Sequence, residues 1–330
     1  MGDRLALSEP IARGEVVAWI TVRSVRFPRD SPNTHSDLEP RASETTLFIP
    51  APGLYVPACV EWRPEEGSFI EHFIPGASVI AVTRRKMGVS ISDIFFAGRP
   101  DTTTSPTASV AFFVQAKEYY PGFTPFKTQL IDLSRPEVEL FGTLSSSTRY
   151  KINRAEREGL HSRVDISPQS DTIAEYANFY DEFARHKSLP ESNVPKLVAL
   201  SKAGGLALSS VTDASGRTLA AHAYVSDSEA RRVRLLYSAS HFRGSDDSGE
   251  RNLIGRANRF LHWQEMVEFK KLGFAFYDLG GLPMDDSDPV KNAIAKFKLE
   301  FGGDHVIEYN GLIPLNILAR AALAVRRKLV

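Results

Sequence analysis

The stretch FAFYDLGG at residues 274–281 decides the fold of this chain. Its apolar and aromatic residues up to Tyr277 predict a short buried strand. Asp278, followed by Gly280 and Gly281, predicts that the strand ends on a carboxylate and a glycine turn. In open α/β sheets the strand ends line the crevice that binds ligands. The stretch therefore predicts a strand that carries an acid into a cleft.

A second stretch, FKLEFGG at residues 297–303, lies one predicted helix further along. Its spacing predicts the end of a helix in which Lys298 stands between Phe297 and Phe301, and its two glycines predict the helix stop. An acid at the end of a strand and a cation one helix later can reach the same crevice. We therefore expect Asp278 and Lys298 to lie close together in an active site.

Composition limits the classes of function. The chain has 330 residues, which suits one large or two medium domains. Its formal net charge of zero argues against binding DNA through bulk electrostatics. Cys59 is the only cysteine and the eight histidines have no ligand spacing, so we expect neither disulfides nor a metal. The lack of a long apolar segment and of a signal-like N-terminus predicts a soluble, cytoplasmic protein.

The pattern of apolar residues changes near residue 126. Before it, strands are expected at 15–27, 78–83, 89–96 and 110–115, with a polar loop over 28–46. After it, helices are expected at 136–144, 148–158, 171–187, 194–202 and 252–271, from 288 and from 314. Strands are expected at 126–133, 161–166, 206–212, 218–226, 231–240, 274–281 and 305–309. The order predicts an α/β fold (an α+β mixed sheet) with a central antiparallel meander.

Three segments in this order resemble the Fem-type branch of the GNAT acyltransferase superfamily. They are STRYKINRAEREGL at 147–160, YDLGG at 277–281 and the FK and FGG of 297–303. The resemblance implies a GNAT-like acyltransferase domain over 126–311 and a C-terminal helix over 312–330. Residues 1–125, the β-rich N-terminal part, would then be a degenerate GNAT-like half. The branch includes enzymes that add amino acids to peptidoglycan precursors from aminoacyl-tRNA, and relatives linked to polysaccharide synthesis that use acyl-CoA.

The chain departs from this family pattern in two places. It has no long heptad stretch for the helical arm that Fem-type peptidoglycan enzymes often carry. Its counterpart of the GNAT pyrophosphate loop, RGSDDSGERN at 243–252, precedes a helix N-terminus that can bind an anion, but its acids would oppose a phosphate. The resemblance implies that acyl-CoA would be bound there by Arg243, Gly244, Gly249 and Asn252.

Asp278 and Lys298 are the first catalytic candidates. Acyl transfer needs a neutral nucleophile, a polarised carbonyl and a route for the released proton. Asp278 could accept the proton of an amine or orient the acceptor; the alternative is that it only shapes the turn. Lys298 could hold a phosphate or a developing oxyanion; the alternative is a lysine whose stem covers an apolar face.

Residues that bind the substrate are expected at the strand end and on the basic helix 148–158. That helix has few apolar anchors, so its cations either face solvent or bind the phosphate of a nucleotide- or lipid-linked sugar. The candidate set is Arg149, Arg154, Tyr277, Gly280 and Gly281.

Two further catalytic candidates lie on the predicted meander. His222 and Tyr224 share one face of strand 218–226, and Tyr237 shares a face of the next strand with Leu235. His222 could be a base and Tyr237 a proton donor to the leaving group. A single histidine on a sheet is more often structural, which is the alternative for both.

The residues and the resemblance together predict an N-acyltransferase that moves an acyl group from acyl-CoA to an amine on a cell-envelope or polysaccharide precursor. Direct attack is expected because no activated serine or cysteine is evident. One alternative is aminoacyl-tRNA-dependent transfer of the peptidoglycan type, which the net charge and the missing arm disfavour. Another is a non-catalytic sugar- or partner-binding protein of the same fold. The C-terminal helix, with Arg326, Arg327 and Lys328, could contact a membrane surface; the alternative, which we favour, is a terminal helix docked on the protein.

Overall fold

The computed structural model of this protein describes residues 18–25, 42–49, 69–71, 81–86, 89–100, 108–240, 247–285 and 287–321. Strands β1 (Ala18–Val25) and β2 (Ala42–Ile49) pair antiparallel as a two-stranded sheet. The polar loop expected over 28–46 is therefore wrong at its end. Its threonines are β-branched and continue into the apolar run that ends β2, so they extend the strand.

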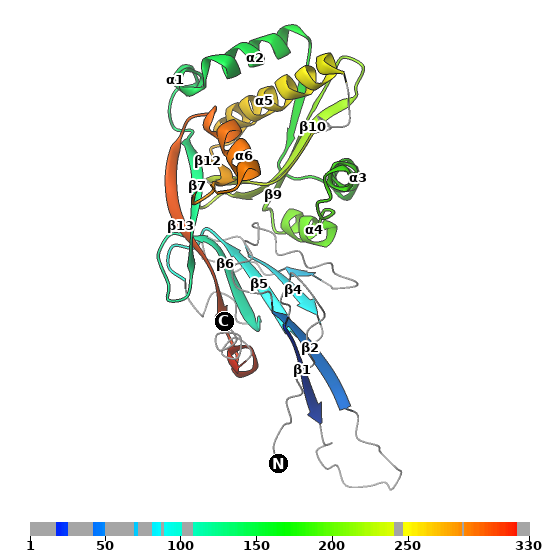
Figure 1. Ribbon diagram of the computed structural model, residues 1–330, viewed down its shortest axis with the longest axis vertical. Helices are drawn as coiled ribbons and strands as arrows, with labels where there is room; N and C mark the ends of the chain where they lie inside the picture. The colour runs from blue at the N-terminus through cyan, green and yellow to red at the C-terminus, as the bar shows by residue number, and fades with distance from the viewer. Residues whose placement is uncertain are drawn as a thin grey trace.

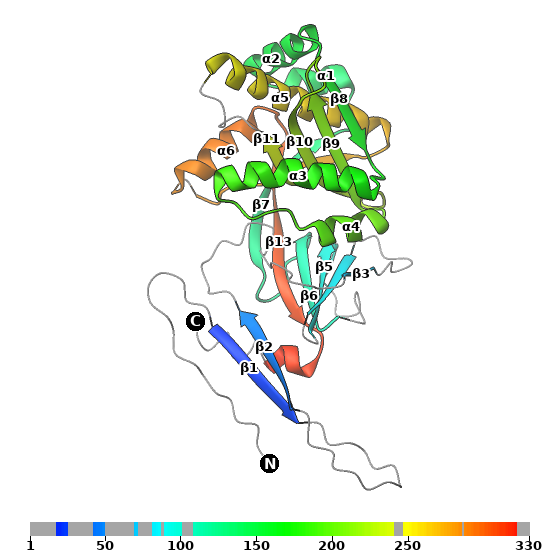
Figure 2. The same ribbon diagram turned by 90° about the vertical axis from the view of Figure 1, so that its right-hand side faces the viewer.

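A single mixed sheet contains all the other described strands (Figures 1 and 2). Their order across the sheet is β3 (Phe69–Glu71), β4 (Ala81–Lys86), β5 (Val89–Phe95), β6 (Val110–Ala116), β13 (Asp304–Pro314), β7 (Thr124–Asp132), β12 (Phe276–Gly281), β11 (Arg232–Ser240), β10 (Thr218–Asp227), β9 (Leu206–Thr212) and β8 (His161–Asp165). The predicted α/β mixed sheet is confirmed. So is the antiparallel meander, which is formed by β9, β10 and β11.

Helices cover both faces of the sheet. The helices are α1 (Glu137–Thr143), α2 (Ser146–Arg157), α3 (Ser170–Lys187), α4 (Val194–Lys202), α5 (Ser248–Lys271) and α6 (Pro289–Leu299). Figure 1 shows α2 and α5 together on one side, and Figure 2 shows α3 crossing in front of β9, β10 and β11. We call these sides the α5 face and the α3 face.

Each face has its own hydrophobic core. On the α5 face, Ala257 and Phe260 of α5 pack with Ile152 of α2 and with Tyr224 and Tyr277 of the sheet. On the α3 face, aromatic residues of α3 and apolar residues of α4 pack against Ala221, Ala223 and Val225 of β10. The alternation along β10 is the two-residue period of a strand buried on both sides.

Helix ends follow the sequence signals. Asp288 caps α6 by accepting hydrogen bonds from the main-chain N–H groups of Val290 and Lys291, and Pro289 opens the helix. Gly159, which follows the end of α2, has a φ of 72°, which favours glycine.

The C-terminal strand β13 lies inside the sheet and joins its two parts, β3 to β6 and β7 to β8. It pairs antiparallel with β6 on one side and with β7 on the other. The strand predicted at 305–309 is longer than expected, and Pro314 ends β13 instead of opening a helix; the helical residues begin at 317. Because β7 starts at Thr124 and the sheet continues across residue 126, the domain division at 125 stays a prediction.

Candidate active site

The strands β11 and β12 separate at the middle of the sheet. They pair in parallel only from Arg232 opposite Phe276 to Arg234 opposite Asp278. Beyond that point β11 continues to pair with β10, and β12 continues to pair with β7. In open α/β sheets, ligands bind in the crevice outside the carboxyl ends of parallel strands. We call the point beyond Arg234 and Asp278, where β11 and β12 no longer pair, the splay.

Both strands that bound the splay carry an extra residue just beyond their last pair. On β11, Tyr237 pairs with Ala223 and Leu235 with Tyr224, so Leu236 is a bulge. On β12, the register shifts between Asp278 and Gly281, and Gly280 has a φ of 75°. A bulge bends its strand and leaves one residue out of the ladder. The two bulges therefore explain how the strands turn apart.

Asp278 is buried at the base of the splay and its oxygens are fully engaged. Its carboxylate accepts hydrogen bonds from Thr128 at 2.5 Å, Gln115 at 2.8 Å, the N–H of Gly280 at 2.7 Å and the guanidinium of Arg232 at 2.5 Å. Burial acts to raise the pKa of Asp278, but the charges of Arg232 and Arg234 and the hydrogen bonds from Thr128 and Arg232 outweigh it and hold the pKa below its usual value. A carboxylate so occupied is suited to fixing the strand end.

Lys298 reaches the same strand end from α6. Its Nζ donates to the carbonyl oxygen of Gly281 at 2.7 Å and lies 3.8 Å from the position that a Cβ on Gly280 would occupy. Burial lowers the pKa of Lys298 to about 8; the Asp278 carboxylate opposes this effect and Arg234 adds to it. The structure therefore brings Asp278, Lys298, Gly280 and Gly281 together, as the sequence predicted.

Arginines surround this strand end on the α3 face. Arg232 bridges Asp278 and Glu308, with 2.6 Å between its Nη1 and the nearer Glu308 oxygen. Arg234 is buried on the same strand with its guanidinium over Phe126. Arg232 and Arg234 thus both lie near the Asp278 carboxylate and hold it in its charged form.

His222 does not face the splay as a free base. It is fully buried on the α5 face, with Nδ1 2.7 Å from Glu265 and Nε2 2.8 Å from Oδ1 of Asn258. Glu265 also accepts hydrogen bonds from Ser209, from Tyr224 at 2.5 Å and from Tyr277 at 2.7 Å. This arrangement matches the structural alternative for His222.

Tyr237 lies on the other face of the sheet from His222. Its ring packs on Tyr180 of α3 at 4.9 Å between centroids, beside the core of the α3 face. Leu235, expected on the same face as Tyr237, packs on the α5 face instead, because the bulge at Leu236 inserts a residue between them. His222 and Tyr237 therefore cannot serve one reaction as a base and acid pair.

Sequence reasoning missed Glu265 and His262, which lie on α5 next to His222. Nδ1 of His262 is 2.6 Å from the Tyr277 hydroxyl, and its ring packs against Phe297 and Phe301. Burial lowers the pKa of His262 to about 4. The available signal was the pair His222 and Tyr224, two polar residues on one face of the buried strand β10. Buried polar groups need hydrogen-bond partners, so a polar residue on the helix that covers this face was to be expected.

His222, His262 and Glu265 also form a set of three potential metal ligands, with donor atoms within 4.8 Å of one another. Hydrogen bonds join the members of this set. At 2.7 Å, the distance from His222 to Glu265 is that of a direct hydrogen bond. The expectation of no metal stays a prediction.

The two arginines predicted to bind phosphate are engaged near the helix that carries them. Arg149 donates to the carbonyl oxygens of Gly142, at 3.0 Å, and of Leu144. Arg154 pairs with Glu158 at 2.8 Å, and this hydrogen bond raises its pKa. These contacts are local to α1 and α2, so the proposed phosphate-binding role of both arginines stays a prediction.

Two of the four predicted CoA-binding residues, Gly249 and Asn252, lie at the N-terminus of α5. Arg243 and Gly244 lie outside the described residues. The N–H of Gly249 donates to Asp247 at 2.9 Å, and the N–H of Glu250 donates to the same carboxylate. Asn252 lies exposed on the first turns of the helix. A side-chain carboxylate therefore occupies the N–H groups that would bind a pyrophosphate.

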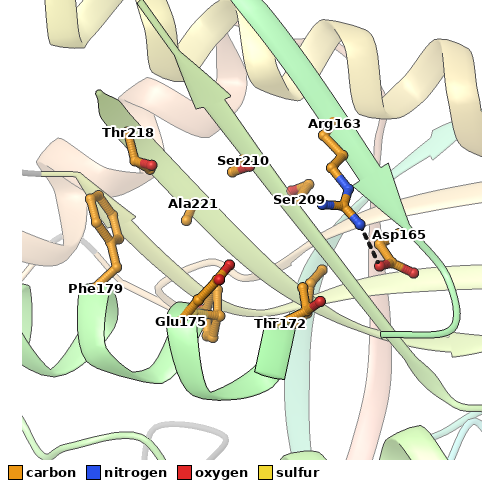
Figure 3. A pocket seen from close by; sticks show the side chains of 11 residues that line it. Arg163, Asp165, Thr172, Glu175, Phe179, Ser209, Ser210, Thr218 and Ala221 are labelled. Carbon is orange, nitrogen blue, oxygen red and sulfur yellow. Dashed lines mark hydrogen bonds and ion pairs between the residues drawn. The ribbon is translucent and has the colours of Figure 1, made fainter. Parts of the chain in front are cut away.

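A separate pocket of about 110 Å³ lies on the α3 face, between α3 and strands β8, β9 and β10 (Figure 3). Phe179 and Glu175 of α3 and Ser210 and Thr218 of the strands point into it, and Arg163 pairs with Asp165 at its rim. Among the described residues, its lining includes none of the predicted site residues. The pocket and the splay are therefore different features.

Comparison with solved structures identifies the fold. The crystal structure of FemX matches with a TM-score of 0.52 and 11% identity over 79% of this chain and 90% of that chain. The C-terminal domain of a putative lysylphosphatidylglycerol synthetase from Agrobacterium fabrum matches with a TM-score of 0.46 and 17% identity over 74% of this chain and 84% of that chain. L-PGS from Bacillus licheniformis matches with a TM-score of 0.46 and 16% identity over 79% of this chain and 88% of that chain.

The likeness to FemX shows that this chain has the fold of the Fem-type branch, as the three sequence segments predicted. No family model matches the sequence, and no curated protein matches it either. Within the described part of the chain, we find no helix with the length and hydropathy that crossing a membrane requires.

Proposed function

We propose that this protein is an N-acyltransferase whose reaction takes place at the splay between β11 and β12. One observation carries the proposal: Lys298 holds a desolvated amino group, with its pKa lowered to about 8, against the glycine turn at the end of β12. A perturbed lysine at a strand end is a frequent mark of a functional site. The fold shared with FemX supports the same reading.

In the proposed reaction, a neutral amine attacks the carbonyl carbon of the donor. The new C–N bond forms, the C–S or C–O bond to the leaving group breaks, and the amine proton passes to the leaving group or to solvent. With a pKa of about 8, Lys298 is mostly protonated at neutral pH, so its ammonium can stabilise the oxyanion. Asp278 would act by holding the strand end, because its oxygens are already hydrogen-bonded.

The proposed donor is acyl-CoA and the proposed acceptor is an amine on a cell-envelope or polysaccharide precursor, as the Fem-type resemblance implies. An aminoacyl ester is the second candidate donor. It is favoured by Asp247, whose carboxylate occupies the N–H groups at the start of α5 and would repel a pyrophosphate. The formal net charge of zero counts against a whole tRNA as the carrier.

Binding of the donor is the first test. Thermal shift is measured with acetyl-CoA, with longer acyl-CoAs and with an aminoacyl-tRNA, because a ligand at one hundred times its Kd adds about 2.7 kcal/mol of stability. A shift with one class identifies the donor. The absence of a shift with every donor would favour a non-catalytic binding protein.

Turnover is the second test. Release of free CoA thiol is followed with a panel of amines, for the wild type, for Lys298→Met and for the control Lys296→Met. Lys296 is exposed on the same helix, so its replacement should leave turnover unchanged. Loss of turnover in Lys298→Met alone supports the assignment, and an active Lys298→Met protein refutes it.

A further inference from the structure

The hydrogen bonds of Glu265 join two strands that are not neighbours. Tyr224 lies on β10 and Tyr277 on β12, while β11 runs between them. Strands two places apart in a sheet are roughly 10 Å from each other. The two hydroxyls are nevertheless 2.7 Å apart, because both side chains lean over β11, and one oxygen of Glu265 accepts from both.

This connection lies at the base of the splay. Tyr277 pairs with Val233, and the next residue, Asp278, is the last on β12 to pair with β11. Beyond it come the bulge at Gly280 and the Gly281 carbonyl that accepts from Lys298. We infer that Glu265 is a positioning residue that fixes where β12 leaves β11 and so holds the glycine turn against Lys298.

The chemistry of a carboxylate suits this position. Glu265 is fully buried and is surrounded by donors from β9, β10 and β12, each of which needs an acceptor. A glutamine of the same shape would bring two N–H donors into this ring of donors. Glu265→Gln therefore weakens the connection while keeping the packing.

Hydrogen exchange measured by mass spectrometry tests the inference on the full chain. We expect protection of the peptide that covers β12 to fall about tenfold to a hundredfold relative to the β6 peptide in Glu265→Gln, as loss of buried charged hydrogen bonds implies. Leu200→Ala is the control, because Leu200 is fully buried in the core of the α3 face. It should lower stability and leave the ratio between the two peptides unchanged.

The pH dependence of Lys298 modification is the second readout. An amine-specific reagent reacts with the neutral amine, so the pH midpoint of modification reports on each lysine. In Glu265→Gln we expect the midpoint for Lys298 to rise toward that of the exposed Lys296, because a loosened strand end admits water. Leu200→Ala should not shift it. If Glu265→Gln does not fold, Tyr277→Phe keeps the ring, removes one hydroxyl and should change both readouts in the same direction to a smaller extent.

Three results would overturn the inference. They are an unchanged peptide ratio, an unchanged pH profile for Lys298, or stoichiometric metal in the purified protein that is lost in His262→Ala. The last result would make Glu265 a metal ligand. The inference deepens the proposed function because it concerns the same splay. Neither readout needs a donor or an acceptor, so failure of the transfer assay and failure of this inference can be told apart.

Discussion

Replacing Lys298 with methionine should stabilise the folded protein at neutral pH. Burial lowers the pKa of Lys298 from 10.5 to about 8. Each pH unit corresponds to about 1.36 kcal/mol, so the charged amine costs about 3 kcal/mol of folding free energy at pH 7. Methionine has similar length and no charge, but it loses the hydrogen bond to Gly281, which contributes about 1 kcal/mol. The expected net gain is about 2 kcal/mol.

The pH dependence follows from the sign of the shift. Below about pH 8 both the folded and the unfolded states hold the proton, so the full difference between variant and wild type is present. Between about pH 8 and pH 10.5 the unfolded wild type binds a proton that the folded wild type does not, so wild-type stability rises with pH. The advantage of Lys298→Met should therefore shrink by about 1.4 kcal/mol per pH unit in that window.

Urea denaturation followed by tryptophan fluorescence at several pH values between 6 and 10 measures this difference. The control is Lys296→Met, which alters an exposed lysine of α6 and should have little effect at any pH. A Lys298→Met protein less stable than wild type at pH 7 would refute the reasoning. A difference that does not change with pH would show that the amine is not desolvated.

Three further predictions concern stability. Arg232→Met leaves Asp278 buried without its main charge partner, so it should lower the free energy of unfolding, measured by urea denaturation, by about 3–5 kcal/mol. Adding Asp278→Asn to this variant should recover part of the lost stability. Gly303→Ala should lower the free energy of unfolding more than Gly159→Ala does in the same assay. Both glycines have a positive φ, but a Cβ at Gly303 would lie 2.6 Å from a main-chain oxygen, whereas a Cβ at Gly159 would meet open space. Equal losses of stability in the two variants would contradict this. The pKa values of Asp278 and Glu265 are held below their usual 3.8 and 4.5, so both groups stabilise the fold above about pH 4.5 and this contribution is lost as pH falls. In Glu265→Gln, stability should therefore fall less steeply with decreasing pH, as measured by acid unfolding followed by fluorescence.

The sequence predicts the local structure around the site well. The meander strands 206–212 and 218–226 match β9 and β10 closely, because short polar turns separate largely apolar runs of strand length. Asp278 and Lys298 meet as expected, because one helix after a strand end returns the chain to that end. Periodicity and turn chemistry suffice for such neighbours.

Features that depend on pairing across the sheet could not be predicted in this way. The bulge at Leu236 reverses the face of Leu235, and a strand's own sequence does not fix the register that creates it. Glu265 stands beside the apolar stripe of α5, where a charged residue normally faces solvent. Its burial depends on donors from β9, β10 and β12, which only the assembled sheet brings to it.

The position of β13 has a consequence for how the chain is made. The main-chain N–H of Gln115 in β6 donates a hydrogen bond to Oδ1 of Asn310 in β13, which lies 195 positions later in the sequence. During synthesis β6 and β7 leave the ribosome long before β13, so each presents an unpaired edge in the meantime. Contacts of such sequence separation form slowly, and exposed edges favour association between chains. Nascent chains that stop before residue 304 should therefore depend on chaperones, and aggregation at that stage would set the yield of the folded protein.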